Sequence, residues 1–331
     1  MFEDILVSII MAVHNEKEEY LKEAIASILN QTYTNLEFII IDDCSNETTQ
    51  RILGDVKDER IKIYRNQTNI GLTKSLNIAL THCNGKYIAR MDADDVSYEK
   101  RIEKQLLYME THSQVGVVGC WTSNNINNKV KHWQGNTSTE WRRVAMLFGN
   151  YGICHPTAFI RKSILDENNI TYNNELKKAQ DYDLWLQLIE VTDMAVMPEC
   201  LLMYRVHEGQ ITNANRGEQL VCRDKIQIEY INKVLTLDDS NANIIISINY
   251  ENVNISDVCD VFEQIEKESR LRGCRLNSII LRNELVRQWT ECCFKKADNK
   301  TKAIFNKYFI SILKPSYLFW RVKLYWHMKI A

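Results

Sequence analysis

Short apolar runs alternate with amphipathic segments through the first 121 residues, and this alternation limits the fold more than any other feature of the sequence. The apolar runs predict strands at residues 5–12, 36–41, 60–64, 87–91 and 115–121. The segments between them predict helices at 18–30, 72–81 and 96–112, and another that opens at Ser45. Strands that alternate with helices form βαβ units, so we expect an α/β fold with a mostly parallel central sheet flanked by helices.

The pattern changes after Thr212, where the apolar residues follow helical spacing only. Helices are predicted at 218–235, 258–270 and 278–294, followed by a tail from Ala303 onward. We therefore expect an α/β domain over residues 1–212 and a helical C-terminal region over 213–331.

Composition excludes several classes of protein. Hydrophobic residues make up 45% of the chain and the net charge is -2, so we expect an ordinary globular core and no nucleic-acid partner. The ten cysteines show no metal-ligand spacing and are predicted to be reduced thiols. The apolar run at residues 5–11 is too short to span a bilayer and is interpreted as a strand, not a signal peptide.

Two of the predicted strands end in carboxylates. One is followed by Asp42-Asp43, and the other by Asp92-Ala93-Asp94-Asp95. Carboxyl ends of parallel strands form the ligand-binding edge of an α/β sheet, and clustered carboxylates suit a hard divalent cation. An acidic turn that caps the next helix is the alternative. The sequence has no glycine-rich phosphate loop, which argues against dinucleotide and P-loop proteins.

Further ordered blocks follow the same chain order as a known family. They read VSIIMAVHN at 7–15, SILNQT at 27–32, EFIIIDD at 37–43, NIGL at 69–72, GKYIARMDADD at 85–95, HPT at 155–157, QDYDLWL at 180–186 and YRVH at 204–207. Together they resemble the family 2 glycosyltransferases, which have the GT-A nucleotide-sugar fold. The resemblance covers about residues 5–212 and implies a nucleotide-sugar-binding half at 1–121 and an acceptor-binding half at 122–212.

The resemblance implies a set of donor contacts. Asp43 matches the residue that hydrogen-bonds the uracil of a UDP-sugar. The Asp92-Ala93-Asp94 motif matches the DxD motif, in which Asp92 and Asp94 would bind a divalent metal, Mn²⁺ or Mg²⁺. The other expected contacts to the nucleotide sugar are Ala12, His14, Asn15, Asn69, Arg90 and Arg205, and His207 is a further candidate metal ligand. A salt bridge to one of the aspartates is the alternative role for Arg90.

The resemblance also implies the chemistry. Asp181 matches the general base of an inverting displacement, and a helix N-cap is its alternative role. The residue before it is Gln180, where the family usually has Glu, and this change leaves the detailed assignment of the base open. Gln180 and His155 are expected on the acceptor side, with a purely structural His155 as the alternative.

Tryptophans are the remaining candidates for the sugar site. Trp185 is predicted to belong to the core, whereas Trp121, Trp133 and Trp141 are candidates for stacking on a sugar. The QxxRW motif of processive synthases is missing, so we expect one sugar to be added per binding event.

The tail beyond Asp298 combines seven Lys or Arg residues with many aromatic residues and has no acidic residue. This composition fits the headgroup region of an anionic membrane. A helix that packs on the domain or forms a homodimer is the alternative. We therefore predict a cytoplasmic enzyme, peripheral on the inner face of the plasma membrane.

The combined prediction is a hexosyltransferase. It would move a hexose (glucose, galactose or an N-acetylated relative) from a UDP-sugar to a hydroxyl of a lipid-linked saccharide, in O-antigen or capsule biosynthesis. A sugar-nucleotide nucleotidyltransferase and an inactive sugar-binding or scaffold protein are the alternatives.

Overall fold

The computed structural model describes residues 4–126, 129–207, 216–235, 237–247, 255–271 and 276–295. The chain divides into two compact units, Met1–Gln227 and Ile228–Ala331, and the division falls inside helix α9 (Arg216–Leu235). The domain boundary predicted after residue 212 lies just before this helix and stays a prediction.

The first unit opens with four parallel strands. They are β1 (Val7–Val13), β2 (Leu36–Asp42), β3 (Ile61–Arg65) and β4 (Tyr87–Arg90), in the order β3-β2-β1-β4. Every residue of β2 and all but one of β1 are buried, as expected of strands covered on both faces. The predicted strands and the parallel arrangement of this part are confirmed.

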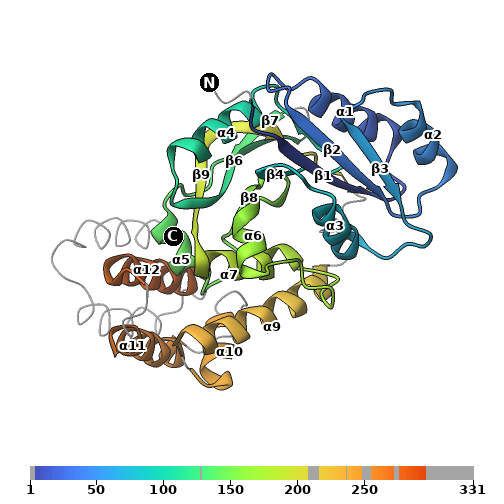
Figure 1. Cartoon of the computed structure of the whole chain (residues 1–331). Helices are drawn as coiled ribbons and strands as arrows, with labels where there is room; N and C mark the ends of the chain where they lie inside the picture. Colours follow the sequence, from blue (N-terminus) through green and yellow to red (C-terminus); the bar gives the residue numbers. More distant parts are fainter. Residues whose placement is uncertain are drawn as a thin grey trace. The chain divides into compact units, whose positions relative to one another are not determined.

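Three helices cover these strands. They are α1 (Glu18–Leu29), α2 (Glu47–Asp55) and α3 (Leu72–Thr81). Helix α1 buries an apolar stripe that includes Leu21, Ile25 and Ile28, and α2 begins where the side chain of Asn46 accepts a hydrogen bond from the Thr49 amide. Figure 1 shows α1 and α2 on one side of the strands and α3 on the other.

The helix predicted at 96–112 is wrong at its start. Residues Val96–Ser97 form the short strand β5, and the helix α4 covers Arg101–Thr111. The Ser97 amide donates to Ser27 Oγ at 3.0 Å, and β5 pairs with the late strand β9. These contacts between distant segments outweigh the local helical pattern.

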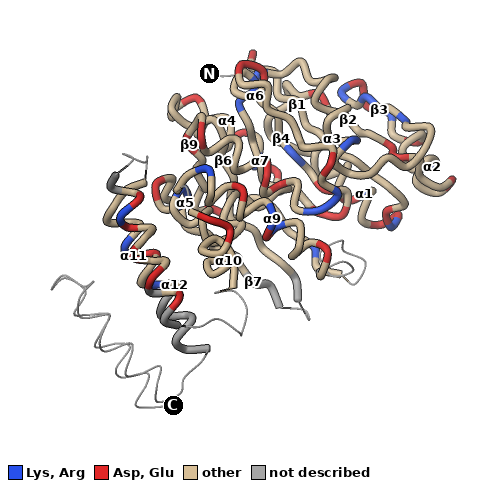
Figure 2. Tube along the Cα trace, turned by 90° about the horizontal axis from the view of Figure 1, so that it is seen from below, with Lys and Arg blue, Asp and Glu red and all other residues tan. Residues whose placement is uncertain are grey.

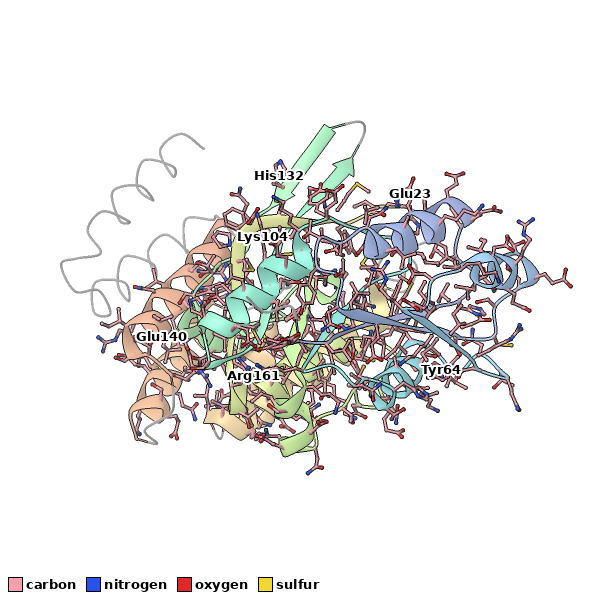
Figure 3. All side chains as sticks on the ribbon, turned by 45° about the horizontal axis from the view of Figure 1, so that its top comes forward. Glu23, Tyr64, Lys104, His132, Glu140 and Arg161 are labelled. Atoms are coloured by element: carbon pink, nitrogen blue, oxygen red, sulfur yellow. The ribbon has the colours of Figure 1, made fainter. Side chains whose placement is uncertain are left out.

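The remainder of the first unit extends the sheet. Its elements are β6 (Val115–Ile126), β7 (Lys129–Trp133), α5 (Thr139–Ala145), the short 3-10 helix η1 (His155–Thr157), β8 (Phe159–Arg161), α6 (Lys162–Asn168), α7 (Gln180–Val191) and β9 (Asp193–Met203). Strand β8 pairs antiparallel with both β4 and β6, so the sheet becomes mixed beyond β4. Among the described residues, nine strands form this one sheet, and β7 extends the hairpin that projects from it in Figure 3.

The second unit is helical wherever it is described, as predicted. Its helices are α10 (Asp239–Ser247), α11 (Ile255–Leu271) and α12 (Ser278–Lys295), and α11 packs against both of the others. Helix α10 was not predicted. Figure 2 shows acidic and basic residues along both α11 and α12. None of the helices in the described ranges is long and apolar enough to cross a bilayer. The predicted basic and aromatic tail lies outside the described residues.

Candidate active site

A cavity of about 980 Å³ lies at the carboxyl edge of the parallel strands. Most of the predicted site residues line it: Ala12, His14, Asp43, Asn69, Arg90, Asp92, Ala93, Asp94, His155, Gln180, Asp181 and His207. They come from segments up to 195 positions apart in the chain, as the difference between 12 and 207 shows. The fold therefore brings the predicted donor side and the predicted acceptor side to one cavity.

Two predicted residues do not line this cavity. The Asn15 side chain accepts a hydrogen bond from the Asn46 amide at 2.7 Å, which ties the end of β1 to the start of α2. The Arg205 side chain donates to the backbone oxygen of Asp94 at 2.7 Å and forms an ion pair with Glu23 of α1, which Figure 3 labels. Both residues hold the walls of the site in place.

Asp43 sits at the end of β2 and is 2% exposed. Its carboxylate accepts hydrogen bonds from the Asn66 side chain at 2.8 Å and from the amides of Ile70 and Gly71 at 2.9 and 2.8 Å. Gly71 has φ +90°, a conformation that strains residues with a Cβ and lets the turn present its amide to Asp43. The carboxylate is held rigidly, and with about four acceptor positions it keeps one for a ligand.

The residues Asp92–Asp95, which follow strand β4, are called the acidic strand end, and the first of them forms an ion pair. Arg90, at the end of β4, is 2% exposed and pairs with Asp92, which confirms the alternative role predicted for Arg90. Burial lowers the pKa of the Arg90 guanidinium, but the charge and hydrogen bond of Asp92 raise it by more, so the net shift is upward. Arg90 therefore stays cationic in the lining of the cavity.

The environments of Asp94 and Asp95 both disfavour a charged carboxylate. Burial and the neighbouring charge of Asp92 raise the pKa of Asp94, although His207 lies 2.9 Å from its Oδ2 atom. Asp95 is fully buried, and burial together with Asp92 and Asp94 raises its pKa well above the usual range. Its Oδ1 atom accepts the Arg205 amide at 2.9 Å, whereas its Oδ2 atom has no hydrogen-bond partner among the described residues.

These carboxylates fit a divalent cation. Asp92, Asp94 and Asp95 each offer an oxygen within 4.8 Å of the others, and hard oxygen donors are what Mg²⁺ and Mn²⁺ prefer. The buried, unsatisfied oxygen of Asp95 and the mutual repulsion of the group would both be relieved by a cation.

The segment that carries His207 is docked on α1. The Arg205 guanidinium lies over the ring of Tyr20, 4.1 Å from its centre, and the His207 ring centre lies 5.4 Å from the same ring. A cation over an aromatic face is favourable in such a partly buried position. Tyr20 thereby helps to place His207 against Asp94, a role that the sequence analysis did not assign.

Asp181 lies in the first turn of α7 and lines the same cavity. The N-cap of this helix is Ala179, so the alternative interpretation of Asp181 as the N-cap is wrong. The Asn150 side chain donates to Asp181 Oδ2 at 3.1 Å. Burial raises the pKa of the Asp181 carboxyl, and the bond from Asn150 and the helix amides only partly oppose this effect. The result is a carboxylate that is more basic than one in water.

His155 lines the cavity and belongs to a cluster of aromatic rings. Its Nε2 atom lies 2.7 Å from the Tyr172 hydroxyl, and its ring meets those of Tyr172 and Trp185 edge to face. Burial and the charge of Arg90 lower the pKa of His155 well below the usual range, so the ring is neutral. Trp185 is fully buried, as predicted, and its ring leaves no room for a Cβ at Gly152.

The three candidate stacking tryptophans are placed differently. Trp141 lines the cavity and meets Tyr151 edge to face, with ring centres 5.5 Å apart. The Trp121 indole donates to the Gly135 carbonyl at 3.0 Å and does not line the cavity. The side chain of Trp133 lies outside the described residues. Trp141 is thus the one of the two described tryptophans that reaches the site.

Arg101, which belongs to the family pattern together with residues 85–95, forms a buried pair with Gln105 that the sequence did not predict. Arg101 and Gln105 of α4 are both 0% exposed. Arg101 donates to the Arg90 carbonyl at 2.7 Å and to the Gln105 side chain at 3.0 Å, and Gln105 donates to the Thr157 carbonyl at 2.8 Å. The pair links β4 to η1, and its spacing of four residues on a helix is the signal that could have revealed it.

Comparison with known proteins places these features in a family. Residues 8–168 match the model of glycosyl transferase family 2. An uncharacterized glycosyltransferase of Haemophilus influenzae is 35% identical over 245 residues, which are 69% of this chain and 75% of that protein. The O-antigen biosynthesis glycosyltransferase WbnJ of Escherichia coli is 36% identical over 210 residues, which are 61% of this chain and 80% of that protein.

A solved structure has the same fold. The structure of Staphylococcus aureus TarS residues 1–349 in complex with UDP-GlcNAc is similar with a TM-score of 0.59. It covers 89% of this chain and 93% of TarS 1–349 at 17% sequence identity. The α/β fold predicted from the sequence, with its helical C-terminal region, is confirmed.

Proposed function

The chain belongs to glycosyl transferase family 2, and we propose that it is an inverting, metal-dependent hexosyltransferase. The donor would be a UDP-sugar and the acceptor a hydroxyl of a lipid-linked saccharide in surface-polysaccharide synthesis. The observation that supports this most is that Asp43, the acidic strand end and Asp181 all line one cavity. Family membership favours glycosyl transfer over nucleotidyl transfer, and the retained carboxylates favour an active enzyme over a scaffold.

The donor proposal has two sources of support. TarS, which has the same fold, was solved with UDP-GlcNAc, and the Escherichia coli relative is described as an O-antigen biosynthesis enzyme. In this chain the rigid carboxylate of Asp43 keeps one acceptor position, which suits the N–H of a uracil ring. Ala12, His14 and Asn69 would form the rest of the nucleotide pocket beside it.

Asp92 and Asp94 would hold the divalent cation, with Asp95 and His207 next to them. When bound, the cation would neutralise the negative charge that develops on the departing diphosphate. The protein's own contribution is to keep Arg90 buried and cationic below the same carboxylates. Because Arg90 offsets one of the three negative charges of Asp92, Asp94 and Asp95, the net charge of the group is close to that needed to balance a divalent cation.

Asp181 would act as the general base. The acceptor hydroxyl transfers its proton to the Asp181 carboxylate while its oxygen forms a bond to the anomeric carbon, and the bond from that carbon to the diphosphate breaks on the opposite face. The Asn150 hydrogen bond fixes one carboxylate oxygen, and the raised pKa strengthens the base. Neutral His155 and Gln180 would contact the acceptor from the same wall.

The location remains a proposal that rests on the tail from residue 299 to 331. An enzyme that is cytoplasmic and peripheral on the membrane would use the basic and aromatic side chains of this tail on the anionic headgroups. Binding of the full chain to vesicles that contain anionic lipid should fall when the Lys and Arg residues of the tail are changed to Gln. Equal binding of the changed chain would refute the membrane role and leave packing on the domain or formation of a homodimer.

A panel of nucleotide sugars tests the activity. Release of UDP is measured with Mn²⁺ or Mg²⁺ and again with EDTA, in the presence and absence of membrane extract as the acceptor source. We expect one UDP-hexose to stand out and EDTA to abolish its turnover. UDP release that EDTA leaves unchanged would overturn the metal role. Formation of UTP and a sugar 1-phosphate from the UDP-sugar and added pyrophosphate would support the nucleotidyltransferase alternative.

A further inference from the structure

The lining of the cavity carries charges of both signs. Its carboxylates include Asp43, Asp92 and Asp94, which belong to the donor and metal site proposed above. Its cationic side chains include Arg142, Lys177 and Lys178, and the two lysines come four and three residues before Asp181 in the chain. The metal site explains the carboxylates, but nothing in the proposed reaction yet explains these three cationic side chains.

Arg142 supplies a fixed, buried positive charge. It is 1% exposed, and its guanidinium donates to the carbonyls of Asn136, Gly152 and Met194 at 2.6, 3.3 and 3.3 Å. These acceptors are neutral, so they orient the guanidinium without cancelling its charge. Burial lowers the pKa of Arg142 only to about 10, which leaves it cationic at neutral pH.

The two lysines lie in a segment whose position is fixed by α3. Thr73 donates to the Leu176 carbonyl at 2.7 Å, immediately before Lys177. The Asn77 side chain donates to the Tyr172 carbonyl at 2.8 Å at the start of the same segment. Lys178 is partly buried and Lys177 is exposed, and neither forms an ion pair or a hydrogen bond with a described residue. Their ammonium groups therefore remain available to a ligand.

Aromatic rings and the proposed base line the same cavity as the lysines. Trp141 and Tyr151 line it as an edge-to-face pair, and the Asn150 side chain joins the Tyr151 segment to Asp181. Aromatic faces suit the C–H surfaces of a sugar, and ammonium groups suit a phosphate or a carboxylate. The two kinds of side chain flank the carboxylate that would accept the acceptor's proton.

We infer that the cavity holds an anion subsite, in which Lys177 and Lys178 bind a phosphate or carboxylate group of the acceptor close to its reacting hydroxyl. The inference rests on the proposed function, because it assumes that Asp181 faces the acceptor. The donor diphosphate does not need these lysines, since the cation that Asp92 and Asp94 would hold would neutralise its charge. Arg142 adds to the positive field of the subsite and is not itself a ligand, because carbonyl groups occupy its donors.

Binding of small anionic sugars tests the subsite directly. The full-length protein is saturated with UDP and Mg²⁺ and titrated with glucose 6-phosphate, glucuronate or glucose while tryptophan fluorescence is recorded. We expect saturable binding of at least one of the anionic sugars, at least tenfold tighter than binding of glucose. A preference for the phosphate or for the carboxylate identifies which group the subsite takes. Equal affinities for all three sugars would overturn the inference.

Variants separate the lysines from general charge effects. The double variant Lys177→Gln/Lys178→Gln should bind the preferred anionic sugar about tenfold more weakly than the wild type. Lys100→Gln is the matched control, because Lys100 is an exposed lysine that does not line the cavity. An unchanged affinity in the double variant, with circular dichroism showing that both variants are folded, would overturn the inference.

Affinity for UDP distinguishes this inference from the proposed function. The double variant should bind UDP with Mg²⁺ as tightly as the wild type does, since the lysines serve the acceptor. If it lost affinity for UDP, the lysines would belong to the donor diphosphate and the inference would fail while the proposed function stood. If the wild type bound no UDP at all, the proposed function would fail instead, and the anionic sugars would still report on the subsite.

Discussion

Two buried acidic groups lie at opposite edges of the same parallel strands, and their surroundings differ sharply. At the amino edge, the Glu37 carboxylate of β2 accepts hydrogen bonds from Ser8 Oγ at 2.6 Å, from Lys62 at 2.8 Å and from the Asn84 amide at 2.7 Å. Burial opposes ionisation, but these bonds together outweigh it and lower the pKa of Glu37 to about 2. The group is complete without any ligand.

At the carboxyl edge the balance is reversed. Burial and mutual repulsion raise the pKa values of Asp94 and Asp95, and one oxygen of Asp95 has no hydrogen-bond partner among the described residues. The Glu37 carboxylate has hydrogen-bond donors for both of its oxygens, whereas Asp95 has, among the described residues, a donor for only one. The difference indicates that the amino edge serves stability and the carboxyl edge is arranged for a charged ligand.

The largest expected effect is a loss of activity when the proposed base is removed. Asp181→Asn should lower kcat by about 10²–10⁴-fold, because the acceptor hydroxyl loses its proton acceptor. Burial raises the pKa of Asp181, so kcat of the wild type should fall as the pH drops through a value above the usual range of an aspartate. The check is a pH profile of UDP release under saturating substrates.

Asp183→Asn is the matched control, because the Asp183 carboxylate accepts a hydrogen bond from Gln187 within the same helix. Its kcat should stay within a few-fold of the wild type. A kcat for Asp181→Asn that is equally close to the wild type would show that another group accepts the proton.

The next effect concerns the acidic strand end. Asp94→Asn removes one charged oxygen donor, so the Mn²⁺ concentration that gives half-maximal activity should rise on the order of 10–100-fold. A titration of activity against free Mn²⁺ measures this change. If the half-maximal concentration were the same in the variant and the wild type, Asp94 would not be a metal ligand.

Glu37→Gln tests the amino edge of the strands, and we expect it to change the stability of the protein but not its activity. The folded-state pKa of Glu37 is depressed, so its ionised form stabilises the fold above about pH 4.5, and this stability is lost as the pH falls towards 2. Discounting for the exposed Lys62 partner, the variant should lose about 2 kcal/mol of unfolding free energy at pH 7. Urea unfolding at pH 7 and pH 3 checks this difference, which should be smaller at pH 3.

The activity of Glu37→Gln per folded molecule should match that of the wild type. A large fall in kcat for this variant would contradict the separation of a structural edge from a functional one.

The smallest effect has the opposite sign. Asp95→Asn replaces a buried, repelled carboxylate by a neutral group of the same shape, so the metal-free protein should gain about 1 kcal/mol of stability. The midpoint of thermal unfolding in EDTA should rise for this variant. A midpoint that falls instead would indicate that Asp95 is satisfied in a way that the described contacts do not include.

Local patterns predicted much of this arrangement, because strand identity depends on neighbouring residues. The strands that end near Asp43 and Asp92, and their common edge, follow from apolar runs and the βαβ rule. The strand at Val96 could not be predicted, because it exists only through its contacts with α1 and β9. The orientation of Arg205 away from the cavity depends on Tyr20 and Glu23, far away in the sequence.

The roles within the site were less predictable than its location. From its sequence alone, Arg90 could serve either as a ligand contact or in an ion pair, and only the fold shows the pair with Asp92. Arg142, Lys177 and Lys178 carried no motif, and their significance comes from the absence of an acidic partner among the described residues of the fold. Charge balance inside a cavity is a property of the fold, and a linear pattern does not reveal it.

The most direct test is the shift in unfolding temperature that UDP and Mn²⁺ cause in three proteins: the wild type, Glu37→Gln and Asp94→Asn. At concentrations about 100 times Kd, the ligands should raise the midpoint by about 5 °C in the wild type. Glu37→Gln should show the same rise from a lower starting temperature, and Asp94→Asn should show about half of it or less. An equal rise in Asp94→Asn, or a rise lost in Glu37→Gln, would contradict the assignment of ligand binding to the carboxyl edge.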